Sequence, residues 1–230
     1  FMKKRSKRYQ LEAKKTSPTP LMLPEAVKKL KTFGSTKFDQ TVNCVLHLGI
    51  DSKQAEQMVR GAISLPHGIG KARRVIAFCE DSDAPAAREA GAIEAGCDEL
   101  IAKVAGGWTD FDVAVASPKV MGKAGKLGRV LGPQGKMPSP KNGTVTADVV
   151  TAVREFAAGK MEFRNDAGGN VHGVVGKLSF DEGKLVDNIQ AFIDHIKKIR
   201  PQSAKGTYIK KICISATMSP SVEIDLSIAS

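Results

Sequence analysis

The chain has 230 residues, 42% of them hydrophobic, which is enough apolar material for one large domain or two domains of roughly 100 residues. No apolar run approaches the roughly 20 residues needed to span a bilayer, and the basic start lacks the apolar stretch of a secretory signal. The sequence therefore predicts a cytoplasmic protein with no membrane partner.

Cysteine and histidine are spread too thinly along the chain to predict a metal site. A zinc site needs ligands in close pairs, and no C-x-x-C spacing occurs. We therefore expect buried, reduced thiols and neither a metal nor another cofactor. The residues concerned are Cys44, Cys79, Cys97, Cys213, His47, His67, His172 and His195.

Positive charge is segregated along the chain, which has a net charge of +11. Residues 1–31 hold ten Lys or Arg against two Glu, and residues 113–147 and 195–222 each hold six with no acid. The acids gather instead between Glu80 and Glu99. This distribution is typical of a protein that binds a polyanion, although a basic surface kept for solubility is the alternative. With 5% aromatic residues, extensive base stacking is not expected.

The first third of the chain predicts a flexible arm, a helix and a half-buried strand. Residues 3–8 are almost all basic and predict the arm, and the proline-containing stretch 16–20 predicts a linker. Pro24 opens a helix through Lys31. Residues 41–48 alternate, which predicts a strand. Its buried face would carry Val42, Cys44, Leu46 and Leu48.

The middle third changes to short apolar runs alternating with helical stretches. Residues 75–79 and 111–116 are the runs, and residues 84–95 and 98–105 are the stretches between them. This pattern predicts a small parallel sheet covered on both faces. A glycine-interrupted helix over 120–130 and a helix over 148–158 would complete the unit.

The last third returns to alternating strands, at 160–164, 171–178 and 207–217. Between them Ser179 and Glu182 form a capping box for a helix that ends before Pro201. The sequence therefore predicts an α+β discontinuous domain, residues 1–67 plus 160–230, with an inserted Rossmann-like α/β domain, residues 68–159. The two crossings, near 66–70 and 159–160, would form a hinge.

Motifs for catalysis or nucleotide binding are missing from the sequence. Neither G-x-x-x-x-G-K-[ST] nor G-x-G-x-x-G occurs, and G-x-S-x-G and H-E-x-x-H are absent too. Carboxylate pairs such as Asp110 and Asp112 lie in contexts typical of helix caps. We expect a protein that is not an enzyme; the alternative is an α/β enzyme whose site assembles from dispersed residues.

Residues 128–146, the signature loop, hold four glycines and three prolines, which exclude regular structure over most of the segment. Its basic residues have no acid beside them. The composition favours a stiff basic loop that contacts RNA or tRNA phosphates, and the alternative is a loop that packs against its own domain. The candidate contact residues are Arg129, Gly132, Gly135, Lys136 and Lys141.

Several motifs in this order resemble the ribosomal protein L-one family of the bacterial type. The motifs are Leu131-Gly132-Pro133-x-Gly135-x-Met137-Pro138-x-Pro140-Lys141-x-Gly143-Thr144-Val145, Lys37-Phe38-Asp39-x-Thr41-Val42, Val59-Arg60-Gly61-x-x-Ser64-Leu65-Pro66-His67-Gly68, Gly107-Trp108-x-Asp110-Phe111-Asp112, Glu162-Phe163-Arg164-Asn165-Asp166 and Lys205-Gly206-Thr207. The resemblance implies a large-subunit protein of the mobile stalk, a monomer off the ribosome, that binds ribosomal RNA, assists release of exit-site tRNA and represses its own operon messenger.

The resemblance also implies which residues of the terminal domain hold the RNA. They are Lys37, Phe38, Thr41, Arg164, Asn165, Asp166, Thr217, Met218 and Ser219. From the polar face of the last predicted strand we add Lys211 and Ser215. Phe38 and Met218 are each either a nucleotide-contacting surface or a core residue.

The sequence departs from the family pattern at three positions. Ser219 stands where the family has glycine, Glu223 where a basic residue is usual, and Gln134 where arginine is common. The first departure puts a very close RNA approach in doubt, and the second weakens a phosphate contact. Phe1 before Met2 is read as either an additional or a mis-called first residue, and no role is assigned to it.

Overall fold

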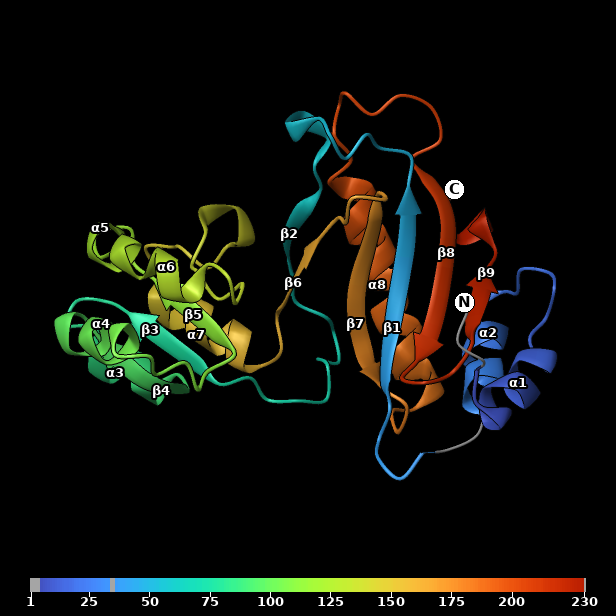
Figure 1. Ribbon diagram of the computed structural model, residues 1–230, viewed down its shortest axis with the longest axis horizontal. Coiled ribbons are helices and arrows are strands. Elements are labelled where there is room, and N and C mark those ends of the chain that lie inside the picture. The colour runs from blue at the N-terminus through green and yellow to red at the C-terminus, as the bar shows by residue number, and fades with distance from the viewer. Residues whose placement is uncertain (1–4, 34–35, 230) are drawn as a thin grey trace. The chain divides into compact units, whose positions relative to one another are not determined.

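The structure is a computed structural model that describes residues 5–33 and 36–229. Two compact units divide the chain: unit 1 comprises the described residues up to Gly70 and from Phe163 onwards, and unit 2 comprises Lys71–Glu162 (Figure 1). The first residues of the predicted arm, Lys3 and Lys4, lie outside the described residues.

Unit 1 is built on a four-stranded antiparallel sheet in the order β7-β1-β8-β9 (Figure 1). Its strands are β1 (Thr41–Leu48), β7 (Asn170–Lys177), β8 (Ile209–Ala216) and β9 (Ser221–Ile224). Helices α2 (Leu23–Lys31) and α8 (Glu182–Lys198) pack against one face of this sheet. The other face of the sheet lies opposite these two helices (Figure 1).

Strand β1 confirms the predicted alternation along its full length. Every second side chain, from Val42 to Leu48, is at most 1% exposed and faces the helices. Burying four apolar side chains stabilises the fold by roughly 1.5–3 kcal/mol each. The intervening side chains of β1 are half-buried on the open face, so the sequence pattern sets which face of the sheet is available.

Three predictions for unit 1 were wrong. The basic start is not flexible throughout, because residues Lys7–Lys14 form helix α1, capped by the Ser6 hydroxyl, which accepts from the Tyr9 amide at 3.3 Å. Ser179 does not cap α8, because its hydroxyl donates to Asp39 Oδ2 at 2.7 Å and Asp181 is the N-cap. The strand over 207–217 is not the last, since β9 follows it.

A two-stranded sheet pairs β2 (Arg60–Ile63) with β6 (Met161–Arg164), and a 3₁₀ turn, η1 (Ala55–Gln57), precedes β2.

The side chain of Asn188 on α8 is fully buried. Its Oδ1 accepts from the His67 amide at 3.1 Å, and its Nδ2 donates to the carbonyls of Gly68 at 2.9 Å and Val175 at 2.8 Å. These bonds fix the end of unit 1's first segment to the sheet.

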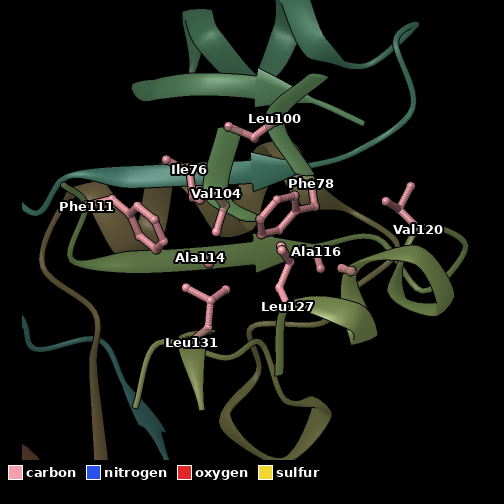
Figure 2. Close-up of a cluster of buried hydrophobic side chains, with 11 residues drawn as sticks. Ile76, Phe78, Leu100, Val104, Phe111, Ala114, Ala116, Val120, Leu127 and Leu131 are labelled. Carbon is pink, nitrogen blue, oxygen red and sulfur yellow. The ribbon is translucent and has the colours of Figure 1, made fainter. Parts of the chain in front are cut away.

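Unit 2 has the predicted parallel sheet, in the order β4-β3-β5. The strands are β3 (Val75–Phe78), β4 (Ala92–Gly96) and β5 (Val113–Ala116), and the helices are α3 (Ala84–Glu89), α4 (Asp98–Ala105) and α7 (Val149–Ala157). Figure 2 shows the core on one face of the sheet, where Phe78 and Phe111 lie beside Leu127 and Leu131. The predicted helix over 84–95 was wrong in its second half, because Gly91 turns the chain at φ 111° into β4.

The signature loop is framed by short helical turns. Before it lie α5 (Met121–Ala124) and η2 (Gly125–Leu127); within it lie α6 (Gly128–Leu131) and η3 (Pro140–Asn142). Its end joins the sheet through a parallel bridge between Val145 and Ala116. A final 3₁₀ turn, η4 (Leu226–Ala229), follows β9. Antiparallel sheets in unit 1 and a parallel sheet in unit 2 confirm the predicted mixed α/β fold class.

Candidate nucleic-acid interface

The open sheet face is the side of the unit 1 sheet that lies opposite α2 and α8. Antiparallel pairing brings half-buried and exposed side chains from neighbouring strands into rows across it. Hydroxyl, amide, imidazole and ammonium groups predominate. The polar residues are Thr41, Asn43, His47, Asn170, His172, Lys177, Lys211, Ser215, Ser221 and Glu223.

Thr41 and Thr217 close one end of this face through reciprocal hydrogen bonds. The Thr217 amide donates to the Thr41 carbonyl at 3.0 Å, and the Thr217 hydroxyl accepts from the Thr41 amide at 3.1 Å. Lys177 Nζ, on the neighbouring strand, donates to the Thr41 hydroxyl at 2.9 Å. Two predicted site residues are therefore joined, and the Thr217 hydroxyl is partly used inside the protein.

The turn after β8 presents Met218 outward. Met218 is 64% exposed and has φ 66°, the left-handed region that L side chains rarely occupy. The Ser219 hydroxyl accepts from the Ala216 amide at 2.9 Å and lies within hydrogen-bond distance of the Ala216 and Pro220 carbonyls. The serine that replaces the family's glycine thus closes the turn on itself, while Met218 is exposed and does not belong to the core.

Lys37 and Phe38 precede β1 and are both exposed. Phe38 is 49% exposed, which excludes the alternative that it is a core residue. The Thr36 hydroxyl donates to the Phe38 carbonyl at 2.8 Å, and Asp39 accepts from both the amide and the hydroxyl of Ser179. This segment is therefore held by its own hydrogen bonds while it presents an aromatic ring and an ammonium group.

The predicted residues Arg164, Asn165 and Asp166 lie at the other end of the face, before β7. Asn165 is buried and its Oδ1 accepts from the Val59 amide at 3.0 Å, so its side chain holds the fold. Asp166 accepts from the amides of Gly168 and Asn170 at 2.8 Å each. Together with the Asn170 side chain, these donors lower the pKa of Asp166 to about 2. Arg164 is exposed.

The predicted residues thus form two groups at opposite ends of the open sheet face. Strand β1 begins at Thr41 and ends at Leu48, beside the start of β7, so seven steps of about 3.3 Å separate the groups by roughly 23 Å. Lys211 and Ser215, paired with His47 and Asn43, occupy the distance between them. A span of this length suits several nucleotides.

Charge on the open sheet face is mixed. Lys211 Nζ lies 2.6 Å from Glu223 Oε2, and this hydrogen bond raises the pKa of Lys211. Glu223, the departure from a usual basic residue, therefore neutralises a neighbouring cation. His172 lies 3.5 Å from Asp166. The open sheet face therefore offers a ligand uncharged polar groups as well as cations.

The two basic outer segments of the chain meet at the Met218 turn. Arg8 on α1 donates from its guanidinium to the Met218 carbonyl at 2.9 Å, and a groove of about 880 Å³ lies between α1 and the turn. Sequence reasoning assigned no site residue on α1, because it predicted a flexible arm there. The Ser6 cap before an eight-residue helix was the available signal.

In unit 2 the signature loop is only partly exposed. Lys136 Nζ donates to the Thr109 carbonyl at 2.8 Å and lies over the Phe111 ring, so this residue packs against its own unit. Arg129 and Lys141 are exposed, as are Gly132 and Gly135. Gly135 needs its positive φ of 69° to turn the loop.

Within residues 5–33 and 36–229 the geometry shows neither a metal site nor a membrane-spanning helix. Among the described residues no group of three or more His, Cys, Asp or Glu is placed to hold a metal ion. Within the same residues, no helix combines the length and the apolar character that crossing a bilayer requires.

Comparison with known proteins identifies the family. Residues 27–220 match the model of the Ribosomal protein L1p/L10e family. The chain is 52% identical over 223 residues to "Large ribosomal subunit protein uL1" of Cutibacterium acnes, covering 96% of both chains. It is 56% identical to the protein of the same name from Rhodopirellula baltica, covering 97% of this chain and 99% of that one. The chain therefore belongs to the Ribosomal protein L1p/L10e family, a family of ribosomal proteins and not of enzymes.

Proposed function

We propose that the protein is a constituent of the large ribosomal subunit that holds the stalk region of large-subunit ribosomal RNA through unit 1. The open sheet face carries this proposal. It offers a row of hydroxyl, amide and ammonium groups roughly 23 Å long, on the side opposite α2 and α8, and exposed Phe38 and Met218 at one end.

The chemistry of this face suits RNA. Folded RNA is recognised largely by shape, through 2′-hydroxyl and phosphate contacts, and through stacking of unpaired bases. Hydroxyl and amide side chains both donate and accept, so they fit a 2′-hydroxyl, while Lys37, Lys177 and Arg164 fit phosphates. The uncharged groups favour selectivity for one RNA shape over non-specific attraction.

A role for the inserted unit is part of the same proposal. Unit 2, with exposed Arg129 and Lys141 on the signature loop, contacts exit-site tRNA and assists its release. Repression of the operon messenger follows if the messenger contains a mimic of the ribosomal site, because the same face of unit 1 binds both RNAs. The predicted boundaries, 1–67 plus 160–230 and 68–159, are proposed as the RNA-binding and tRNA-contacting domains.

Titration of the whole chain with a stalk-junction fragment of large-subunit ribosomal RNA tests the proposal. We expect tight binding that falls linearly with the logarithm of salt concentration, and weaker binding to a scrambled duplex of equal length. Equal affinity for both RNAs across the salt series would contradict the proposal, since non-specific attraction alone would explain it.

A charge-neutral variant pair localises the binding. Ser215→Val removes a hydroxyl from the open sheet face, next to Asn43, whereas Thr151→Val removes an exposed hydroxyl from unit 2. The first is expected to weaken binding of the fragment about fivefold, because one hydrogen bond is worth about 1 kcal/mol. The second is expected to leave it within twofold.

A further inference from the structure

Helix α1 carries the strongest unassigned feature of the molecule. Its start faces the Met218 turn across the groove of about 880 Å³. From the helix side the groove is lined by Arg5, Ser6, Arg8 and Tyr9. The opposite wall comes from the end of β8 and its turn, which include Ser215 and Thr217.

Arg5 and Tyr9 form a pair at this groove. The Arg5 guanidinium carbon lies 4.8 Å from the centre of the Tyr9 ring, and Arg5 is exposed whereas Tyr9 is half-buried. A guanidinium held over an aromatic ring keeps a planar, charged surface toward solvent at low entropic cost. Unpaired bases stack on such guanidinium planes as well as on aromatic rings.

Arg8 fixes the distance between the two walls of the groove. Its guanidinium donates to the Met218 carbonyl at 2.9 Å, and Glu12, one helical turn away, lies 3.7 Å from Arg8 Nε. The carbonyl that Arg8 holds belongs to the residue with positive φ, so the arginine stabilises the turn in that conformation. Arg8 is therefore a positioning residue, whereas Arg5 and Tyr9 are available to a ligand.

We propose that α1 and the Met218 turn form a binding site for one unpaired nucleotide of the bound RNA, with its base on the Arg5–Tyr9 pair. The hydroxyls of Ser6 and Ser215 line the same groove and suit the nucleotide's sugar or phosphate. This inference rests on the proposed function, because the nucleotide belongs to the RNA that the open sheet face holds. It adds a contact on a segment outside the residues assigned to binding so far.

Arginine variants of the whole chain, titrated with the stalk-junction RNA fragment, test the site. Arg5→Ala is expected to weaken binding at least fivefold, the lower end of what one stacked base contributes. Arg5→Lys keeps the positive charge but loses the planar guanidinium, so it is expected to weaken binding nearly as much as Arg5→Ala does. Leu11→Ala, at a 62% exposed position of the same helix outside the groove, is the matched control and is expected to stay within twofold.

A double-mutant cycle identifies the nucleotide. Each unpaired nucleotide of the fragment is made abasic in turn, and its effect is measured with the wild type and with Tyr9→Ala. For one position the two losses should be strongly non-additive, as for partners in contact. Circular dichroism of each variant verifies that α1 remains folded.

The outcomes separate this site from the proposed function. If the wild type binds the fragment selectively while Arg5→Ala and Tyr9→Ala stay within twofold, the nucleotide site is wrong and the function stands. An Arg5→Lys variant that binds like the wild type would also contradict base stacking on the Arg5–Tyr9 pair, because the positive charge alone would then account for the binding. A wild type without selectivity would instead refute the proposed function itself.

Discussion

The Thr217 hydroxyl accepts a hydrogen bond of 3.1 Å from the amide of Thr41, 176 residues earlier in the chain. It also lies 3.3 Å from the Thr41 carbonyl, and the backbones of the two residues are joined at 3.0 Å. One side chain thus ties the beginning of β1 to the end of β8. Because this hydroxyl both accepts from and donates to Thr41, the structural role is established, and the proposed function adds a role in binding RNA.

We therefore expect Thr217→Ala to lower both stability and RNA affinity. Loss of the hydroxyl leaves the half-buried Thr41 amide unpaired, which costs about 1 kcal/mol of the free energy of unfolding. Affinity for the stalk-junction fragment should fall about fivefold or more. Urea unfolding and RNA titration measure the two effects. Thr217→Ser, which retains the hydroxyl, should restore most of both, and an alanine variant that binds RNA normally would remove Thr217 from the site.

Replacing Met218 by glycine is expected to change stability and RNA binding in opposite directions. A left-handed conformation costs an L residue roughly 1–2 kcal/mol, and Met218 has φ 66°. Met218→Gly is therefore expected to raise the free energy of unfolding by about 0.5–1 kcal/mol, after glycine's own entropic cost. The same change removes an exposed side chain at the groove and should weaken RNA binding severalfold.

The control for Met218 is Met22→Ala, another exposed methionine of unit 1, at 50% exposure. It is expected to leave RNA affinity within twofold. Thermal unfolding and titration of the same preparations give both quantities. Destabilisation by Met218→Gly would contradict the strain argument, and unchanged affinity would show that the methionine side chain contributes nothing to binding.

The Lys211–Glu223 pair predicts a variant that binds more tightly. Glu223 Oε2 lies 2.6 Å from Lys211 Nζ, so the carboxylate neutralises the charge of this lysine. Glu223→Gln should free Lys211 for a phosphate, raising affinity and steepening the salt dependence by roughly 0.7–0.9 in the logarithmic slope. Lys211→Gln should then cost more in the Glu223→Gln background than in the wild type. Equal costs in both backgrounds would mean that Lys211 makes no phosphate contact in either.

Much of the fold could be predicted from local pattern, because alternation and apolar runs report burial directly. Strand β1 spans the predicted residues 41–48, since its period of two has no competing signal. Strand β4 was missed because Ala92–Gly96 is alanine-rich and follows a helix, so only the positive φ of Gly91 separates the two elements. The capping box failed because a distant residue, Asp39, takes the Ser179 hydroxyl.

The candidate site was predictable as a set of residues but not as an arrangement. Family motifs supplied Thr41, Thr217 and Asp166, whereas their division between two ends of one face depends on the register of β1 against β7 and β8. That register is a long-range property. The Ser6 cap is a local signal for helix α1, but the contacts of Lys177 with Thr41 and of Arg8 with Met218 join residues more than a hundred positions apart, which local composition does not predict.

Replacing Asn188 is expected to cause a large loss of stability although the residue lies away from the open sheet face. Its buried amide makes three hydrogen bonds, to His67, Gly68 and Val175. Asn188→Ala leaves these backbone groups unpaired, so it should lower the free energy of unfolding by about 2–4 kcal/mol. Urea unfolding measures this difference. Asn43→Ala, a half-buried asparagine on the open face, should change it by no more than about 0.5 kcal/mol. Similar effects of the two variants would refute this anchoring role.

Glu162 predicts a pH dependence confined to unit 2. Burial raises the pKa of Glu162 above its ordinary value, while Asn142 of the signature loop, which donates to it at 2.6 Å, lowers the pKa to a smaller extent. A carboxyl whose pKa is raised in the folded state favours folding when protonated. Stability is therefore lost as pH rises from the unfolded pKa through the raised folded pKa.

Glu162→Gln should accordingly match the wild type in acid and exceed it in stability at neutral pH. Fluorescence of Trp108, the single tryptophan, follows the unfolding of unit 2 across the pH series. Asn142→Ala should raise the pKa of Glu162 further and enlarge the difference, because the charged carboxylate loses its donor. A difference between Glu162→Gln and wild type that stays constant from acid to neutral pH would mean that the carboxyl titrates alike in the folded and unfolded chain.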